Sequence, residues 1–211
     1  MQTFFNIFLL CIIAYVLGAF PSGYFCAKFF SNIDLRKIGS GTVGASNAGR
    51  VLGAIGFIFV FLCDMGKAYG FIFFTSSFLP NFSLVLLLLS IILILGNIFS
   101  FGSSYPQGKG VSAALGALLY FNMQLFFLFI IAWIAIVLIC KIPTHASLLS
   151  LCFITIVSFC YKSTMEIKFF LIVLHPILFY THRILLQKIL LYERVAWFLK
   201  QLHVRLQRLK K

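Results

Sequence analysis

A segment between residues 34 and 50, with the sequence DLRKIGSGTVGASNAGR, contains the residue types that proteins use to bind anions. Glycines let the backbone approach a ligand closely and turn its N–H groups toward a negative charge. Ser40 adds a hydroxyl group, and Arg50 adds a planar guanidinium that can hold a phosphate through two hydrogen bonds. The segment is therefore a candidate phosphate-binding loop. Three further candidate substrate-binding residues in it are Gly39, Gly41 and Asn47.

The same glycines also match the GxGxxG pattern of dinucleotide-binding proteins. Asp64 stands about where that pattern expects an acidic residue. The pattern requires a preceding strand and a βαβ unit, however, whereas here it lies between stretches apolar enough to span a membrane. A dinucleotide site is therefore rejected. The remaining alternative for the segment is a flexible loop without a ligand.

A second candidate site is a lysine between two glycines, Gly108, Lys109 and Gly110. It resembles a P-loop, but the spacing from Gly102 is one residue too long and Gly110 replaces the serine or threonine that binds Mg²⁺. A lysine here precedes a predicted helix, whose free N–H groups and dipole favour a phosphate. These three residues are candidate phosphate ligands. The alternative is a solvated turn whose lysine serves only as an orientation signal.

One histidine, His182, stands beside Arg183 at the end of the last apolar stretch, where it could orient a substrate or accept a proton. His175 is expected to be an interior residue, and His145 and His203 are weaker candidates. The cysteines are scattered, with neither a CxxC pair nor a histidine at ligand spacing. No metal site is predicted.

Asp64 and Lys67 are three residues apart within a predicted membrane span. Residues at this spacing share a helix face, and charged residues inside membranes are usually paired or functional. We expect a structural ion pair. Close helix packing is the expected role of four glycines in or just before the same span: Gly49, Gly53, Gly66 and Gly70.

The elements that must position these residues are membrane helices, because 62% of the 211 residues are hydrophobic and only 10% are charged. Seven stretches approach the length of a membrane span. We predict an all-α polytopic membrane protein with about seven transmembrane helices and glycine-rich or re-entrant cytosolic loops. The stretches are approximately Thr3–Phe20, Val51–Leu79, Phe82–Phe101, Val111–Phe121, Met123–Cys140, Ala146–Cys160 and Ile167–Thr181.

The formal net charge of +13 is distributed unevenly, and most basic residues fall on one predicted side together with the three polar segments that carry the candidate residues. The positive-inside rule makes that side cytosolic, along with the C-terminus. Residues 1–185 then form the transmembrane domain, and residues 186–211 form a basic amphipathic tail. We expect this tail to bind anionic membrane lipids rather than nucleic acid, with a protein partner as the alternative.

Taken together, residues 18–24 (GAFPSGY), 34–50, 108–110 and 182–183 resemble the bacterial acyl-phosphate:glycerol-3-phosphate acyltransferase family. The resemblance covers about residues 5–190. It implies an enzyme of the bacterial inner membrane that moves an acyl chain from acyl phosphate to glycerol 3-phosphate, giving lysophosphatidic acid and phosphate. No cofactor is implied.

By this resemblance the active-site positions are Ser40, Arg50, Lys109, Ser147 and His182. Arg50 and Lys109 are expected to bind phosphate, and His182 to position the acceptor. A diverged, non-catalytic relative that binds phosphorylated lipids or metabolites is the alternative, and a transporter ranks behind it because no inverted repeat is found. The sequence departs from the family pattern at Thr42, Ser46, Asn97, Gln107 and Leu185.

Overall fold

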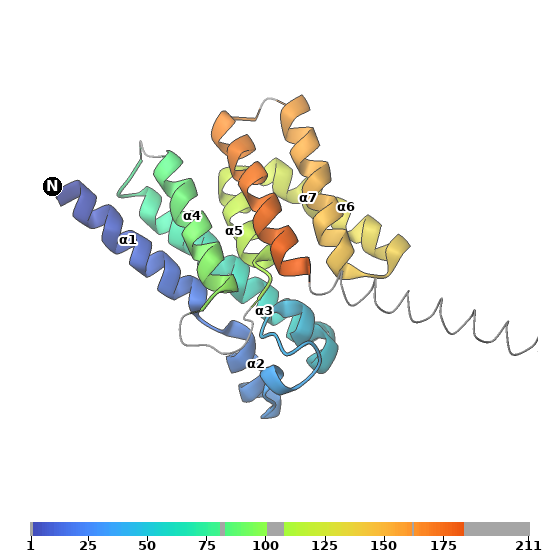
Figure 1. Ribbon diagram of the computed structural model, residues 1–211. Helices are drawn as coiled ribbons and strands as arrows, with labels where there is room; N and C mark the ends of the chain where they lie inside the picture. Colours follow the sequence, from blue (N-terminus) through green and yellow to red (C-terminus); the bar gives the residue numbers. More distant parts are fainter. Residues whose placement is uncertain (1, 81–82, 101–107, 162, 184–211) are drawn as a thin grey trace, which may run out of the picture.

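The computed structural model describes residues 2–80, 83–100, 108–161 and 163–183, and these residues form a helical bundle (Figure 1). The predicted all-α class is confirmed. The first helices are α1 (Gln2–Ala19), α2 (Ser22–Ser31), the 3₁₀ turn η1 (Leu35–Lys37) and α3 (Ala45–Ser76). They are followed by α4 (Ser83–Ile98), α5 (Val111–Phe121), α6 (Met123–Cys140), α7 (Pro143–Cys160) and a last helix, Met165–Arg183.

Each of the seven predicted stretches contains a helix, but the helices differ in length. Four helical segments of the described chain are long and apolar enough to cross a membrane: Phe4–Ser31, which takes in α1 and α2, then α3, α6 and the last helix. In contrast, α5 has 11 residues. At 1.5 Å per residue it is about 16 Å long, roughly half of the hydrocarbon thickness. The stretch predicted as a short fourth span is therefore a half-length helix with a largely buried surface.

Helix α2 was not predicted, since residues 21–50 were treated as one polar segment. It begins after Pro21 and ends at Asn32, which has a left-handed backbone conformation with φ 52°. Gly23 lies so close to the backbone of Val43 that a Cβ would overlap the Val43 carbonyl group. Helix α2 also packs against α3, so it supports the glycine-rich loop from behind.

Helix α3 is broken at Gly53, whose φ of 73° and ψ of −165° are not helical. A first short helical segment, from residue 45 to the break, therefore has its own direction and carries Ser46 and Arg50. The predicted close-packing role is wrong for Gly53, Gly66 and Gly70, because no described atom lies within 4 Å of a Cβ built on them.

Close backbone packing occurs at other glycines. A Cβ on Gly18 of α1 would overlap the carbonyl oxygen of Leu93, and one on Gly96 of α4 would overlap that of Tyr15. These two glycines bring α1 and α4 together, and Figure 1 shows the two helices side by side. Gly116 does the same between α5 and α3, where a Cβ would meet the Met65 carbonyl oxygen.

Alanine substitutions at two glycines of α3 distinguish the effect of backbone strain on stability from the effect of side-chain packing. Gly53→Ala should destabilise the protein by about 1–3 kcal/mol, because its φ and ψ belong to a region that is almost exclusive to glycine. Gly66→Ala is the matched control. It should leave stability unchanged or raise it by up to about 1 kcal/mol, since that glycine is helical and has room for a Cβ. Thermal unfolding in detergent measures both, and equal shifts would contradict a strained break.

Candidate active site

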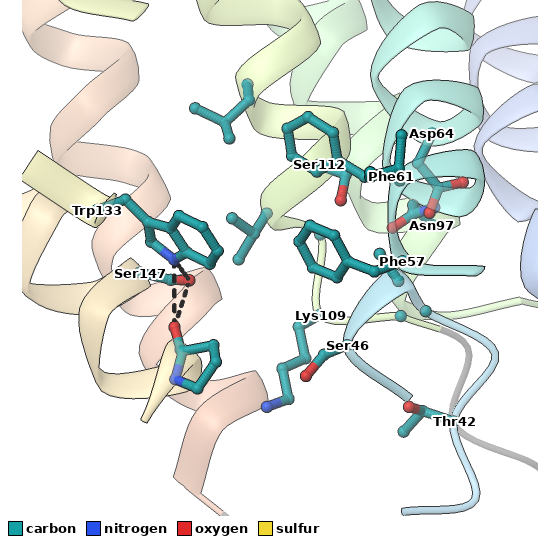
Figure 2. Close-up of a pocket in the computed structure, with 18 of the residues that line it drawn as sticks. Thr42, Ser46, Phe57, Phe61, Asp64, Asn97, Lys109, Ser112, Trp133 and Ser147 are labelled. Carbon is teal, nitrogen blue, oxygen red and sulfur yellow. Dashed lines mark hydrogen bonds between the residues drawn. The ribbon is translucent and has the colours of Figure 1, made fainter. Parts of the chain in front are cut away.

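The loops and helix ends at one end of the bundle enclose a cavity of about 370 Å³ (Figure 2). This size lies within the usual range of ligand pockets, about 300–1,000 Å³. The cavity brings together candidate residues that are far apart in the sequence. Those that line it are Ser40, Arg50, Gly108, Lys109, Gly110, Ser147 and His182. Gly39, Gly41 and Asn47 are not among its lining residues.

Asn47 organises the glycine-rich loop from behind the cavity. Its side chain is fully buried. The amide nitrogen donates to the carbonyl oxygens of Leu35 at 3.1 Å, Ile38 at 3.0 Å and Thr42 at 2.8 Å. The amide oxygen accepts from the backbone N–H of Ser40 at 2.9 Å. Asn47 therefore fixes the conformation of the loop backbone. Because it does not line the cavity, we expect it to position the loop rather than to contact a ligand.

Gly39 and Gly41 provide the backbone conformations that this loop needs. Both have left-handed φ values, 67° and 73°. A Cβ on Gly39 would also overlap the amide oxygen of Asn47. The result is that the exposed Ser40 lines the cavity, with its hydroxyl 3.1 Å from that of Thr42.

The second loop is fixed between α4 and the last helix. The backbone N–H of Gly108 donates to the Asn97 carbonyl oxygen at 3.0 Å, and the hydroxyl of Thr181 donates to the Lys109 carbonyl oxygen at 3.2 Å. Gly110, with φ 81°, is the residue immediately before the first residue of α5, Val111. Lys109 is thus held beside the N-terminus of α5, where the helix dipole favours an anion.

Burial, with the nearby positive charge of Arg50 as the smaller cause, lowers the pKa of Lys109 to about 8. Two cations share this end of the cavity, because Arg50 also lines it. Their mutual repulsion would be relieved by a bound anion. Arg36 of the same polar segment pairs with Asp34 at 2.8 Å and lies over the Tyr24 ring, and it does not line the cavity.

His182 is buried, with 1% of its surface exposed, and lines the cavity. Its Nδ1 lies 2.7 Å from the Leu178 carbonyl oxygen. Because a carbonyl oxygen can only accept, Nδ1 carries the hydrogen, and in the neutral ring Nε2 is then the acceptor. The ring is therefore held in the tautomer that can accept a hydrogen bond from a substrate hydroxyl.

Ser147 lies at the start of α7, and its hydroxyl donates to the Pro143 carbonyl oxygen at 3.0 Å. The indole N–H of Trp133 donates to the same Ser147 oxygen at 3.1 Å, as Figure 2 shows. Sequence reasoning missed Trp133, because a tryptophan within an apolar stretch looks like any other membrane-facing residue. The only available signal was that an indole N–H inside a membrane needs a partner.

The predicted ion pair between Asp64 and Lys67 is confirmed at 3.0 Å. Lys67 also donates to the carbonyl oxygens of Gly18 at 2.9 Å and Phe20 at 3.0 Å, where α1 ends. Asp64 lines the cavity and accepts from the hydroxyl of Ser22, at the start of α2, at 2.8 Å. The pair therefore holds the junction of α1 and α2 against the middle of α3.

Several expected features stand apart from the cavity. Nδ1 of His175 contacts the Leu171 carbonyl oxygen at 2.8 Å within its own helix, as expected of an interior residue. Gln107, Leu185 and the tail 186–211 lie outside the described residues. In the part of the chain that the structure describes, no three His, Cys, Asp or Glu side chains are grouped so as to hold a metal ion.

The fold and the cavity define a helical integral membrane protein with a basic ligand pocket at one end of its bundle. The family model for glycerol-3-phosphate acyltransferases matches residues 8–191. The chain therefore belongs to the glycerol-3-phosphate acyltransferase family.

Relatives and solved structures agree with this assignment. The glycerol-3-phosphate acyltransferase 2 of Lactobacillus acidophilus is 35% identical over 150 residues, 71% of each chain. That of Levilactobacillus brevis is 30% identical over 188 residues, 85% of this chain and 88% of the relative. The glycerol 3-phosphate form of PlsY (YgiH), an integral membrane glycerol 3-phosphate acyltransferase, has a TM-score of 0.79 at 28% identity, covering 88% of this chain and 92% of that one. Its lysophosphatidic acid form has a TM-score of 0.78 at 26% identity over the same shares.

Two substitutions in the glycine-rich loop should have different effects. Asn47→Ala should lower the free energy of unfolding by at least about 2 kcal/mol, because it leaves several buried backbone groups without partners. Ser40→Ala removes one exposed hydroxyl and should change stability by less than about 0.5 kcal/mol while weakening the binding of sulfate, a non-reactive anion. Denaturant titration in micelles measures the free energy of unfolding, and calorimetry measures the affinity for sulfate. A stable Asn47→Ala protein would refute the positioning role.

The affinity for sulfate should depend on pH through Lys109. Sulfate keeps its charge across the range, whereas Lys109 loses its proton as the pH rises through about 8. Because only the protonated amine attracts the anion, the affinity should be constant at lower pH and fall about tenfold between pH 7 and pH 9. The Lys109→Arg protein should show a flat profile, since arginine stays charged. A fall of equal size in both proteins would assign the effect to another group.

Proposed function

We propose that this chain transfers an acyl group from acyl phosphate to glycerol 3-phosphate, forming lysophosphatidic acid and phosphate. The observation that carries the proposal is the two-ended cavity. One end holds two cations, Arg50 and Lys109, with hydroxyl groups and His182. The other end is formed by apolar side chains of α3, α5 and α6, among them Phe61 and Phe129. Such a cavity matches a ligand with a phosphate head and a hydrocarbon chain.

The apolar end opens sideways, toward the region that lipid would occupy. Helices α3 and α6 each pack closely against α5, whereas over the described residues they have little backbone packing against each other. Ile58, Leu62 and Ile134 line the cavity between them and are each about half exposed, at 52%, 51% and 48%. An acyl phosphate can therefore reach the site from the bilayer with its chain between α3 and α6. Glycerol 3-phosphate reaches the polar end from water.

The chemistry needs no covalent enzyme intermediate, because acyl phosphate is already activated. We assign Arg50 and Lys109 to the phosphate groups of donor and acceptor, whose negative charges would otherwise repel each other. The acceptor hydroxyl attacks the acyl carbon, and the bond between that carbon and the phosphate oxygen breaks. The hydroxyl proton passes to Nε2 of His182 or to the departing phosphate. Ser40 supplies its hydroxyl group to the acyl oxygen or the phosphate, and Ser147 holds the indole of Trp133 at the cavity wall.

The site is assigned to the cytoplasmic side of the bacterial inner membrane. Basic residues at the site end of the bundle include Arg36, Lys37, Lys109 and Lys141, whereas Lys168 lies in the first turn of the last helix, at the opposite end. The positive-inside rule then places the site and the C-terminus in the cytosol. For the tail 186–211 we propose binding to anionic lipids of the same leaflet.

Purified protein incubated with hexadecanoyl phosphate and radiolabelled glycerol 3-phosphate should form labelled lysophosphatidic acid. Lys109→Ala should lower kcat/KM by at least about 100-fold, because it removes a half-buried positive charge from the phosphate site. Lys37→Ala is the matched control, since this exposed lysine of η1 does not line the cavity, and its rate should match the wild type. Wild-type activity in Lys109→Ala would refute the site. Binding of both substrates without any product would instead favour a non-catalytic relative.

A further inference from the structure

Two aromatic rings span the opening between α3 and α6. The rings of Phe57 on α3 and Trp133 on α6 are stacked, with centroids 6.1 Å apart and planes 10° from parallel. Because α3 and α6 have little backbone packing against each other over the described residues, this stack is a bridge across the mouth of the cavity. Both residues line the cavity.

The bridge lies where the polar end of the cavity meets its apolar end. In Figure 2, Phe57 and Trp133 stand between Lys109 and Ser46 on one side and Phe61 on the other. The order along α3 agrees, since Ser46 precedes Phe57 and Phe61 follows it by one turn. A chain that runs from a phosphate at Lys109 to the apolar end must therefore pass these two rings with its first carbons.

Both rings are held in place. The indole N–H of Trp133 donates to the oxygen of Ser147 at 3.1 Å and lies 3.3 Å from the Pro143 carbonyl oxygen. The ring of Phe57 stacks on that of Phe61 as well, with centroids 5.8 Å apart and an angle of 13°. The bridge is thus anchored to α7 on one side and to the next turn of α3 on the other.

The spacing leaves no passage between the ring faces. A methylene chain between two rings needs about 7–8 Å, because each carbon contact takes about 3.5–4.0 Å, and the ring centroids are only 6.1 Å apart. The acyl chain must instead pass along the ring edges, toward α5. Methyl branches on the first carbons of the acyl chain, which lie beside the rings, would collide with them.

We propose that the Phe57–Trp133 bridge makes the enzyme select acyl phosphates that are unbranched next to the carbonyl group. The inference rests on the proposed function and adds to it the class of acyl donor. It assigns a specificity-determining role to two residues that carry no reactive group. Branching at the far end of the chain, beyond the bridge, should be tolerated.

The first test compares hexadecanoyl phosphate with its 2-methyl and 3-methyl derivatives as donors. The wild type should prefer the unbranched donor at least about tenfold in kcat/KM, the usual cost of one misplaced methyl group in a pocket. Trp133→Leu and Phe57→Leu should each reduce this preference by at least threefold. Trp133→Phe should keep it, because the ring remains while the hydrogen bond to Ser147 is lost. Phe127→Leu is the control, since Phe127 is an exposed aromatic residue of α6 outside the cavity lining.

A second measurement follows the path of the chain without turnover. The sequence has two tryptophans, so Trp197→Phe leaves Trp133 as the only indole fluorophore. A non-reactive hexadecyl phosphonate brominated near its head should quench Trp133 more strongly than one brominated near its tail. Equal quenching, or an unchanged donor preference in both leucine variants, would overturn the inference. If no donor gives product while head-group quenching is strong, the proposed reaction fails but the binding path stands.

Discussion

A helix that ends or breaks in or beside a membrane leaves carbonyl and N–H groups without partners, and lipid cannot supply any. This constraint governs the whole functional end of the protein. Lys67 donates to the carbonyl groups at the end of α1, Asn47 to those of the glycine-rich loop, and Thr181 to that of Lys109. At these three places, polar side chains supply the partners that the backbone carbonyl groups lack. The site exists because these side chains allow loops where helices would otherwise be required.

The same constraint explains the uneven helices. A chain of full spans would carry every polar residue to the membrane surface and leave the interior closed. The short α5 and the break at Gly53 instead bring a helix start and a separate helical segment to the cavity. The N-terminus of α5 and the first segment of α3 then face one cavity, with Lys109 on one and Arg50 on the other. Shortened helices create both the space and the orientation of its charges.

Much of this could be predicted from the sequence, because apolar length predicts helices and residue type predicts chemistry. The positions of all seven apolar stretches, the Asp64–Lys67 pair and the presence of Lys109 at a helix start followed from local patterns. Three features did not. Helix α2 is too short, and too mixed in polar and apolar residues, to be recognised. The hydrogen bonds of Asn47 go to loop carbonyl groups whose positions the sequence does not reveal. Trp133 becomes important only through its contacts with α3 and α7. Such features arise from tertiary contacts that no local pattern encodes.

Because the cavity opens sideways between α3 and α6, the concentration of a ligand that enters there is its concentration within the bilayer. For a ligand that arrives through Ile58 and Ile134, the solvent is the bilayer, and its availability is a mole fraction among neighbouring lipids rather than a molarity in water. The ligand that arrives at Lys109 obeys ordinary aqueous concentration. With the entry routes proposed above, one cavity draws its two ligands from a two-dimensional and a three-dimensional solvent. An increase in membrane area lowers the mole fraction of the ligand that enters from the bilayer and leaves the concentration of the water-soluble ligand unchanged.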